Sequence, residues 1–329
     1  MDLRLVFLGT AGAVPTILRG PSGLLVIRGG ERFLIDCGEG TQRQLMRSVG
    51  LGRIDRVFLT HYHGDHYLGL PGMLKTLSLQ ERESPLDIYG PPGLEELFTT
   101  AYRVFGRFLF EVRLHEVANG VVFEGDGYDI AAASTDHGAP SVAWALREES
   151  RPGRFHPETA VALGVAPGPD FRRLQMGESL VLPCGDVVEP EQVMDEHRAG
   201  RTVVVSGDTR PCAGVLSLAG GASVLVHDAT FTEAERGRAL DTRHSTSGEA
   251  AEMARECGVG ALILTHISSR HSRRELLGEA RSIFDRSYLP DDLDHLVVPF
   301  PEKGPPELLR APADGDGLFA DCPQSGESV

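Results

Sequence analysis

The sequence predicts a layered α/β (α+β) fold. Short apolar and β-branched runs alternate with stretches of helical periodicity along residues 1–303. Five of those runs are followed within a few residues by His or Asp, as expected where the strands of a sheet bring polar side chains to one edge. The composition, with 41% hydrophobic and 24% charged residues over 329 positions, is that of a globular protein with a large core.

The first element is a strand that begins near Leu3, and we expect no secretory signal before it. No run reaches the roughly 18 apolar residues of a membrane span, so we expect none. The loop over residues 9–16 resembles a dinucleotide-binding turn only superficially, because GxGxxG is not matched and Pro15 intrudes. The five cysteines are scattered without a CxxC pair, which favours reduced thiols in a cytoplasmic protein.

The later strands are predicted from the runs that precede His and Asp. The runs are residues 56–60 before His61, 128–133 before Asp136 and His137, 202–205 before Asp208, 223–226 before His227 and Asp228, and 261–265 before His266. Since the carboxyl ends of neighbouring strands meet at one edge of a sheet, we expect side chains from several runs to converge there.

The densest group of candidate ligands is His61-Tyr62-His63-Gly64-Asp65-His66. Gly64 permits a tight turn after the strand. Residues at alternate positions, His61 and His63, are expected to point into one site, and Asp65 and His66 into a second. Imidazole and carboxylate suit zinc with a coordination position left open for water, so the pattern predicts a catalytic metal site.

Two metal ions need more ligands than this segment supplies. His137, Asp208 and His266, each at the end of a different strand, are the candidates that complete the set, and Asp208 has two oxygens with which to bridge. A pair of ions roughly 3.5–4 Å apart generates hydroxide near neutral pH and holds both the attacking and the leaving oxygen. The chemistry predicted is phosphate ester hydrolysis.

His244 stands before a predicted helix. Thr246 and Glu249 have the spacing of a capping box, and Gly258 marks the end of the helix. A histidine beside a helix N-terminus is well placed near phosphate and is a candidate proton donor to a leaving oxygen.

The pattern loosens between about residues 150 and 200, where turn-forming residues are frequent. Residues 151–175 contain four arginines and two acids, a local charge of +2. The arginines are Arg151, Arg154, Arg172 and Arg173. Two interpretations stay open: an exposed surface insertion, or a basic arm that holds a polyanion.

The formal net charge of −15 argues against a general nucleic-acid binder. The Pro/Gly-rich segment 304–329, predicted to be a disordered acidic tail, accounts for −4 of it. We therefore expect any RNA binding to be localised and sensitive to salt.

The motifs together resemble ribonuclease Z, the family of tRNA 3′-processing endonucleases in the metallo-β-lactamase superfamily. The HxHxDH pattern marks only the superfamily. Three further segments resemble the ribonuclease Z family itself: DCGEGTQ at residues 36–42, HST at 244–246 and LTHISSR at 264–270. The resemblance implies a four-layer αββα sandwich over residues 1–303, with an inserted, flexible tRNA-binding arm at about residues 150–200.

The resemblance also implies roles for individual residues. One zinc ion would bind His61, His63 and His137, a second Asp65, His66 and His266, with Asp208 bridging. Asp65 would act as general base toward the water, and His244 would protonate the departing 3′ oxygen. The implied activity is two-metal hydroxide attack that removes the 3′ trailer from precursor tRNA, leaving a tRNA 3′-hydroxyl and a 5′-phosphate on the trailer. A homodimer is implied as well, in which one subunit's arm, with Arg151, Arg154, Arg172 and Arg173, holds the tRNA for the other's site.

The sequence departs from the family at Asp228, where a glutamate usually orients the histidine of the HST motif. The carboxylate is one methylene shorter here. Residues 171–175, FRRLQ, also replace a segment in which Gly and Lys are more usual. None of these departures touches the predicted metal ligands.

Three other functions remain as alternatives. The first is a zinc hydrolase of a small phosphodiester, which would not need the arm. The second is a di-iron redox protein on the same fold, which resembles HxExDH and so disagrees with His63. The third is a non-catalytic RNA-binding module, which would leave the complete ligand set unexplained.

Overall fold

The computed structural model describes residues 1–312. Within it the chain forms two compact units: Met1–Arg147 together with the chain from Thr202, and Glu148–Arg201. We call the second unit the arm and the first the main unit.

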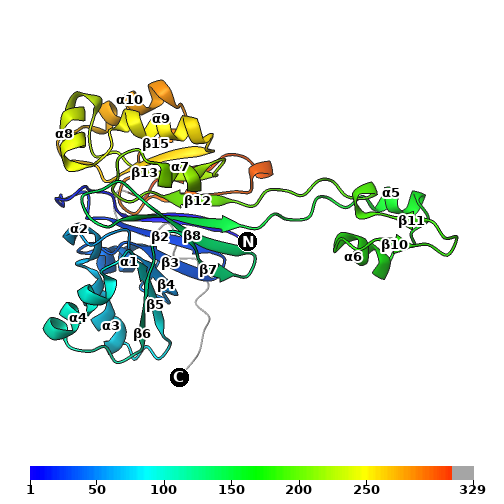
Figure 1. Cartoon of the computed structure of the whole chain (residues 1–329), viewed down its shortest axis with the longest axis horizontal. Helices are drawn as coiled ribbons and strands as arrows, with labels where there is room; N and C mark the ends of the chain where they lie inside the picture. Colours follow the sequence, from blue (N-terminus) through cyan, green and yellow to red (C-terminus); the bar gives the residue numbers. More distant parts are fainter. Residues whose placement is uncertain (313–329) are drawn as a thin grey trace. The chain divides into compact units, whose positions relative to one another are not determined.

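The main unit contains two large sheets (Figure 1). The first is made of β1 (Leu3–Gly9), β2 (Gly23–Arg28), β3 (Glu31–Ile35), β4 (Arg56–Phe58), β5 (Leu86–Gly90), β6 (Val112–Glu116), β16 (His295–Val297) and β17 (Glu307–Leu309). Their spatial order is β17-β16-β1-β2-β3-β4-β5-β6. The strands from β3 to β6 run parallel, and the remaining pairs are antiparallel.

The second sheet consists of β7 (Gly120–Gly125), β8 (Tyr128–Ser134), β9 (Val142–Glu148), β12 (Thr202–Val205), β13 (Val224–Asp228), β14 (Ala261–Thr265) and β15 (Ser287–Tyr288). Their order is β15-β14-β13-β12-β9-β8-β7. β12, β13, β14 and β15 are parallel, so their carboxyl ends lie at one edge. The five predicted runs all contain strands of the two sheets.

Helices cover the outer face of each sheet. Those beside the first sheet are α1 (Thr41–Ser48), α2 (Gly64–Tyr67), α3 (Leu70–Leu79) and α4 (Leu94–Phe105). Those beside the second are α7 (Ala213–Ala219), α8 (Arg236–Thr242), α9 (Ser247–Cys257) and α10 (Arg273–Ile283), with short 3-10 turns at η2 (Glu233–Glu235) and η3 (Pro301–Lys303). The predicted four-layer αββα sandwich is confirmed.

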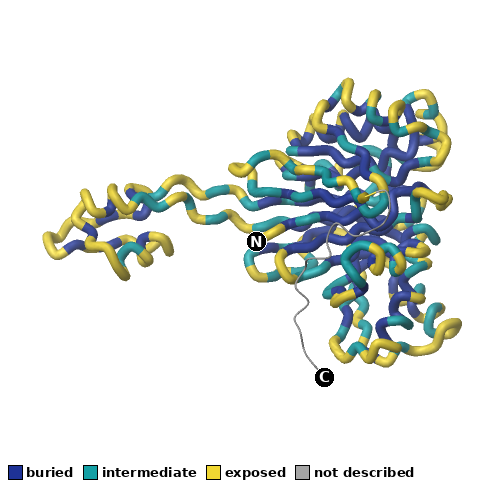
Figure 2. Tube along the Cα trace, turned by 180° about the vertical axis from the view of Figure 1, so that it is seen from behind, coloured by how far each residue is buried: buried dark blue, intermediate teal, exposed yellow. Residues whose placement is uncertain are grey.

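Side chains alternate between the layers because successive residues of a strand point to opposite faces. In β13, Val224 and Val226 belong to the core between the two sheets, whereas Leu225 packs under the helices of the second sheet. In β1, Phe7 lies between the sheets and Leu8 under the helices of the first. Both faces of these strands are therefore buried, as the continuous blue of the inner strands in Figure 2 shows.

The arm contains α5 (Pro157–Ala162), α6 (Pro169–Gln175), a 3-10 turn η1 (Pro190–Gln192) and the two-stranded sheet of β10 (Leu180–Val181) and β11 (Val187–Val188). It has a small apolar core that includes Ala160, Leu174 and Val193. Arg201 forms a two-bond pair with Glu148, which joins the two ends of the arm.

The arm as a whole is acidic, although residues 151–175 taken alone carry a net positive charge. Residues 148–201 contain ten acidic side chains and six arginines, a net charge of −4. Six of the acids lie between residues 178 and 196, where there is no Lys or Arg. Positive charge in the arm is thus confined to its six arginines. If RNA binds the arm, we expect its phosphates to contact those arginines and not the acidic residues 178–196.

The tail differs from the sequence expectation at its start. Glu307–Leu309, predicted to be disordered with the rest of 304–329, pair with β16 as strand β17, because Leu308 packs against the core between the sheets. The remainder of the predicted tail, residues 313–329, lies outside the described residues. Among the helices of the described chain, none is long and apolar enough to cross a membrane.

Candidate metal centre and active site

Seven His and Asp side chains from four separate segments converge in the main unit. They form two groups, each with ligand atoms within 4.8 Å of one another: His61, His63, His137 and Asp208 in the first, and Asp65, His66, Asp208 and His266 in the second. These are all the residues that the sequence analysis predicts as metal ligands. Asp208 is common to both groups.

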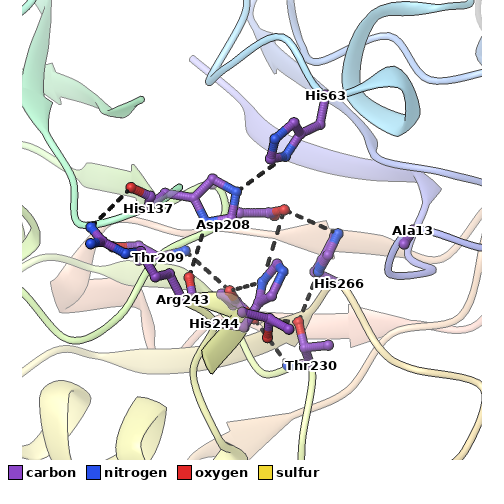
Figure 3. Close-up of polar contacts among 12 residues, drawn as sticks. Ala13, His63, His137, Asp208, Thr209, Thr230, Arg243, His244 and His266 are labelled. Carbon is purple, nitrogen blue, oxygen red and sulfur yellow. Dashed lines mark hydrogen bonds and ion pairs between the residues drawn. The ribbon is translucent and has the colours of Figure 1, made fainter. Parts of the chain in front are cut away.

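The first group has three imidazoles around one point. Nδ1 of His63 lies 3.0 Å from Nε2 of His61. It also lies 3.2 Å from Nε2 of His137, a contact that Figure 3 shows. Burial lowers the pKa of His61 and of His137 below the ordinary value of 6.5. The rings of His61 and His137 are therefore neutral at physiological pH, which is the form that binds metal.

The second group is centred on the Oδ2 atom of Asp208. This oxygen lies 3.3 Å from Nε2 of both His66 and His266. The Oδ2 atom of Asp65 approaches the same nitrogens at 3.4 and 3.2 Å. Burial raises the pKa of Asp208, but His266 and His66 lower it much further, so the carboxylate is ionised. Two carboxylates in a buried site make the local potential negative, which favours a cation.

The other ring nitrogen of each buried histidine is held by a fixed partner. Nδ1 of His66 contacts Oδ2 of Asp36 at 2.7 Å, and Nδ1 of His137 contacts the Arg243 carbonyl oxygen at 3.0 Å. Since both partners are acceptors, each Nδ1 carries a hydrogen and Nε2 is the nitrogen directed into the site. Burial lowers the pKa of His66, but Asp208 and Asp36 raise it well above 6.5, so a metal ion would displace the proton on its Nε2.

Hydroxyl groups hold the remaining two rings. Nδ1 of His61 lies 3.1 Å from Thr60 Oγ1, and Nδ1 of His266 lies 2.8 Å from Thr230 Oγ1. Each hydroxyl donates its own hydrogen to a carboxylate, Thr60 to Asp36 and Thr230 to Asp228. The hydroxyl oxygens therefore accept from Nδ1–H, and again Nε2 is the nitrogen directed into the site.

The chemistry of the donor set fits divalent metal ions. Four buried histidines direct Nε2 into the site, and Nε2 of His66 makes no well-aligned hydrogen bond although it is fully buried. Such an atom is costly in a protein interior unless a ligand satisfies it. The cluster is thus able to bind divalent metal.

His244 lies beside the cluster and is held by Asp228. Its Nδ1 donates to Asp228 Oδ2 at 2.8 Å, and its ring stacks on that of His266 with 5.0 Å between centroids. Asp228 is completely buried and also accepts from the Thr209 and Thr230 backbone N–H groups. The shorter side chain of Asp228 therefore still reaches His244.

The charge on Asp228 keeps His244 protonated. Burial lowers the pKa of His244, but the Asp228 carboxylate, by its charge and its hydrogen bond, raises it to about 9. At neutral pH the Nε2 atom thus carries a hydrogen that it can donate.

Helix α9 begins where the sequence analysis predicts. Thr246 Oγ1 accepts from the Glu249 backbone N–H at 3.1 Å, the Glu249 side chain accepts from the Thr246 N–H, and Gly258 ends the helix in the left-handed conformation. This capping box fixes the chain immediately after His244.

Four residues of the site have a positive φ angle that non-glycine residues seldom adopt. They are Ala13, Asp36, Arg243 and His266, with φ between 56° and 58°. Only two other non-glycine residues of the described chain, Glu81 and Leu293, share this conformation. Backbone strain is therefore concentrated at the site.

The sequence matches the model of the metallo-beta-lactamase superfamily over residues 16–266, a range that includes the whole His/Asp cluster. A protein named Ribonuclease Z from Methanosarcina acetivorans is 46% identical over 303 residues, which are 91% of this chain and 99% of that protein. Its namesake from Haloferax volcanii is 48% identical over 91% of this chain and 96% of its own. The chain belongs to the ribonuclease Z family.

Membership of the ribonuclease Z family makes the chain a phosphodiester hydrolase. A third Ribonuclease Z, from Myxococcus xanthus, is 46% identical over 85% of this chain and 92% of that protein. Among solved structures, the short form of human tRNase Z is 28% identical, with a TM-score of 0.66 and coverage of 90% of this chain and 99% of that one. The likeness thus extends over nearly the full length of these relatives.

The four arginines predicted to bind substrate lie in the arm. Arg151 forms a bridge with Arg198 through backbone atoms, Arg154 is exposed, and Arg172 and Arg173 are on α6. Arg173 is paired with Glu178 at 3.0 Å and with Asp170 at 3.6 Å. Its positive charge is therefore largely neutralised within the arm.

The residues that orient the side chains of this cluster were not among those predicted from the sequence. Asp36 directly follows β3, so the rule that identified the other residues at strand ends would have found it. Ala13 was missed for another reason. Its backbone N–H donates to Asp65 Oδ2 at 3.0 Å, from the loop that superficially resembled a dinucleotide turn, and no side chain signals such a contact.

Proposed function

We propose that this protein is a zinc-dependent endonuclease that removes the 3′ trailer from precursor tRNA. The observation that carries the proposal is the pairing of a seven-residue His/Asp cluster with the His244–Asp228 pair beside it, in a chain 46% identical to a Ribonuclease Z over 99% of that protein. The cluster supplies the ligands for hydrolysis, and His244 supplies the proton for a leaving oxygen.

Two zinc ions per subunit would be held by this cluster. His61, His63 and His137 would hold the first, and Asp65, His66 and His266 the second, with Asp208 between them. When bound, such ions activate water and neutralise charge on the phosphate. The hydrogen bonds from each Nδ1 to its partner would keep the ligand rings in one orientation.

Asp65 would accept a hydrogen bond from the attacking water. Its carboxylate already accepts from the Ala13 N–H, and although burial raises its pKa, hydrogen bonds from His266 and His66 lower it far more. The carboxylate is thus ionised, as a group that orients water and receives its proton must be.

His244 would protonate the 3′ oxygen of the tRNA as the bond to phosphorus breaks. Asp228 accepts the hydrogen bond from Nδ1, so Nε2–H is the ring donor that remains for the substrate. The products would be a tRNA with a 3′-hydroxyl and a trailer with a 5′-phosphate.

Cleavage of precursor tRNA is the direct test. Purified protein loaded with zinc or manganese should cut precursors near the end of the acceptor stem, and mapping of both product ends should show the 3′-hydroxyl and the 5′-phosphate. Absence of any cut near the acceptor end with either metal would refute the proposed function. Metal analysis of the same samples should give two zinc ions per subunit.

The arm distinguishes a tRNA substrate from a small phosphodiester. Arg147 and Thr202 are paired across β9 and β12, so a short turn can replace residues 149–200 without altering the sheet. The shortened protein should lose cleavage of precursor tRNA but retain hydrolysis of bis(p-nitrophenyl) phosphate. Equal loss on both substrates would favour a small-ester hydrolase whose site the deletion damages.

We also propose a cytoplasmic homodimer, since precursor tRNA is an intracellular substrate and an arm of one subunit would serve the other's site. Sedimentation analysis should give twice the mass of the 35.5 kDa chain. Mixing the arm-deleted protein with a His63→Ala variant should restore cleavage if the arm acts between subunits. A monomer, or no restoration, would contradict the dimer.

A further inference from the structure

Arg210 connects the segment that carries Asp208 to the backbone of His244. Its Nη1 atom donates to the His244 carbonyl oxygen at 2.6 Å and to Glu249 Oε2 at 2.6 Å, and its Nη2 atom pairs with Glu249 Oε1. The side chains are 12% and 3% exposed. The Arg210 backbone N–H in turn donates to the Asp136 carbonyl oxygen at 2.9 Å, beside His137.

His244 lies in a connection that has no regular secondary structure. It follows Arg243, whose φ is +56°, and precedes α9, which begins at Ser247. Apart from Arg210, its backbone is held by a hydrogen bond from its own N–H to the Ala239 carbonyl oxygen at 2.9 Å. The guanidinium therefore fixes the carbonyl side of His244 and, through the chain, the distance from His244 to Asp208.

Only an arginine matches this arrangement. The planar guanidinium donates from both Nη atoms to Glu249 and from Nη1 to the His244 carbonyl oxygen, whereas a lysine ammonium has no fixed fork. Glu249 is itself rigid, since it is the N3 residue of the α9 capping box. Replacing a buried ion pair by apolar residues of the same volume often changes the stability of a protein little. The test therefore measures how the Arg210–Glu249 pair affects the position of His244, not how it affects stability.

We propose that Arg210 and Glu249 form a positioning pair that aims His244 at the leaving oxygen. The proposal rests on the proposed role of His244 as the proton donor. In this proposal the Arg210 side chain contacts neither the predicted metal ligands' side chains nor the substrate. It acts only through the backbone of His244.

The test compares substitutions in the full-length, metal-loaded protein. Arg210→Lys keeps the charge, and the double variant Arg210→Met/Glu249→Gln removes the pair without leaving a buried charge unpartnered. Arg236→Ala is the matched control, because Arg236 pairs with Glu249 Oε1 at 3.2 Å but makes no contact with the His244 carbonyl. Since a misplacement of about 1 Å can lower a rate by about 100-fold, we expect kcat on precursor tRNA to fall roughly 10- to 100-fold in the first two and to stay unchanged in the control.

A substrate whose leaving group needs no proton distinguishes misplacement of His244 from general damage to the site. p-Nitrophenolate departs without a proton, so hydrolysis of bis(p-nitrophenyl) phosphate should change by less than about threefold in the Arg210 variants. In a His244→Ala background the Arg210 substitutions should cause no further loss on precursor tRNA. Equal losses on both substrates, losses that multiply with His244→Ala, or lost metal would each overturn the proposal.

A spectroscopic measurement tests the positioning even if precursor tRNA is not the substrate. The Nδ1–H proton of His244, hydrogen-bonded to Asp228, should give a low-field proton resonance that is absent in His244→Ala. That resonance should shift or disappear in Arg210→Lys and in the double variant and persist in Arg236→Ala. A resonance unchanged in all variants would overturn the positioning pair, whereas failure to cut precursor tRNA by the unmodified protein would overturn only the proposed function.

Discussion

At the scale of single residues, Asp36 determines both the orientation and the tautomer of His66. Its Oδ2 atom accepts from His66 Nδ1 at 2.7 Å, and its Oδ1 atom accepts from the Thr60 backbone N–H at 2.8 Å. The carboxylate thus connects a predicted ligand to the strand end that carries His61. Partners of this kind raise the basicity of the ligand ring as well as fixing it.

Asp36→Asn should weaken metal binding. Asn tolerates the φ of +56° and can still accept from the Thr60 N–H, so the fold should persist. Because the ring loses a charged partner, we expect metal affinity to fall by roughly 10- to 100-fold, measured by competition with a chelator. Asp55→Asn, which alters a carboxylate that accepts from the Arg32 N–H in the same sheet, is the control and should bind metal normally. Unchanged affinity in Asp36→Asn would contradict this account.

His244→Ala should lower kcat on precursor tRNA by about 10²- to 10⁴-fold, the usual contribution of a proton donor. Asp228→Asn should have a smaller effect of the same kind, since an amide cannot hold the His244 ring protonated as the carboxylate does. Metal content should be the same in both variants as in the unmodified protein. Loss of metal from His244→Ala would show that His244 is a ligand, as its place in a third group with Asp208, Asp228 and His266 would allow.

The convergence of the His/Asp cluster could be predicted from the sequence because each of its segments follows a strand-like run. Their supporting residues could not be predicted in the same way. Thr230 and Arg210 have no distinctive spacing, and each acquires its role only when the fold brings it to His266 or to His244. The contribution of Ala13 is a backbone N–H, which every non-proline residue has.

At the scale of elements, the helices and strands of the main unit follow the sequence pattern, and those of the arm do not. α9 has its capping box, its apolar face and its terminal glycine in the sequence. β10 and β11 are two residues long, and α5 has six, so their periodicity is too brief to recognise. The arm is stabilised by its small core instead, which depends on contacts between distant residues.

Leu174→Ala should unfold the arm and leave the main unit intact. Leu174 is completely buried in the arm's core, where such a truncation costs about 2–5 kcal/mol. Hydrogen exchange should then become fast throughout residues 148–201 and stay slow in β12, β13 and β14. Met176→Ala, at a side chain 68% exposed, serves as the control and should not change exchange. Protection that persists in the Leu174→Ala arm would show that its core is not what stabilises it.

The arm should also respond to pH through His156. Its Nε2 lies 2.8 Å from Asp195 Oδ1, and this hydrogen bond raises the pKa of His156 above 6.5. A raised pKa in the folded arm means that the stabilisation is fully present below 6.5 and is lost as the pH rises through the higher value. An NMR titration should place the pKa of His156 above 6.5 in the intact protein and lower in Asp195→Asn than in the intact protein. Equal values in the two proteins would contradict the pairing.

At the scale of the whole molecule, the net charge of −15 requires any RNA contact to be local. Among the described residues, Arg172 has no ion-pair partner, whereas Arg173 on the same helix is paired with Glu178. The two are thus a matched pair for measuring which arginines meet phosphate.

Arg172→Ala should reduce the slope of log affinity for precursor tRNA against log salt by about 1, the loss of one phosphate contact. Arg173→Ala should change the slope less, since Glu178 already neutralises that side chain. Binding at several salt concentrations, measured by filter retention, gives both slopes. If neither substitution alters the slope, α6 does not contact the RNA backbone.

The non-glycine residues with positive φ at the site lower the stability of the folded protein. Each such residue costs of the order of 1–3 kcal/mol, and Ala13, Asp36, Arg243 and His266 are all beside the candidate catalytic groups. Glycine at Arg243 or Ala13 would relieve that cost, yet it would also loosen the segments that carry His244 and the N–H directed at Asp65. Selection for heat resistance should therefore favour changes far from these four positions, and variants stabilised at them should be slower enzymes.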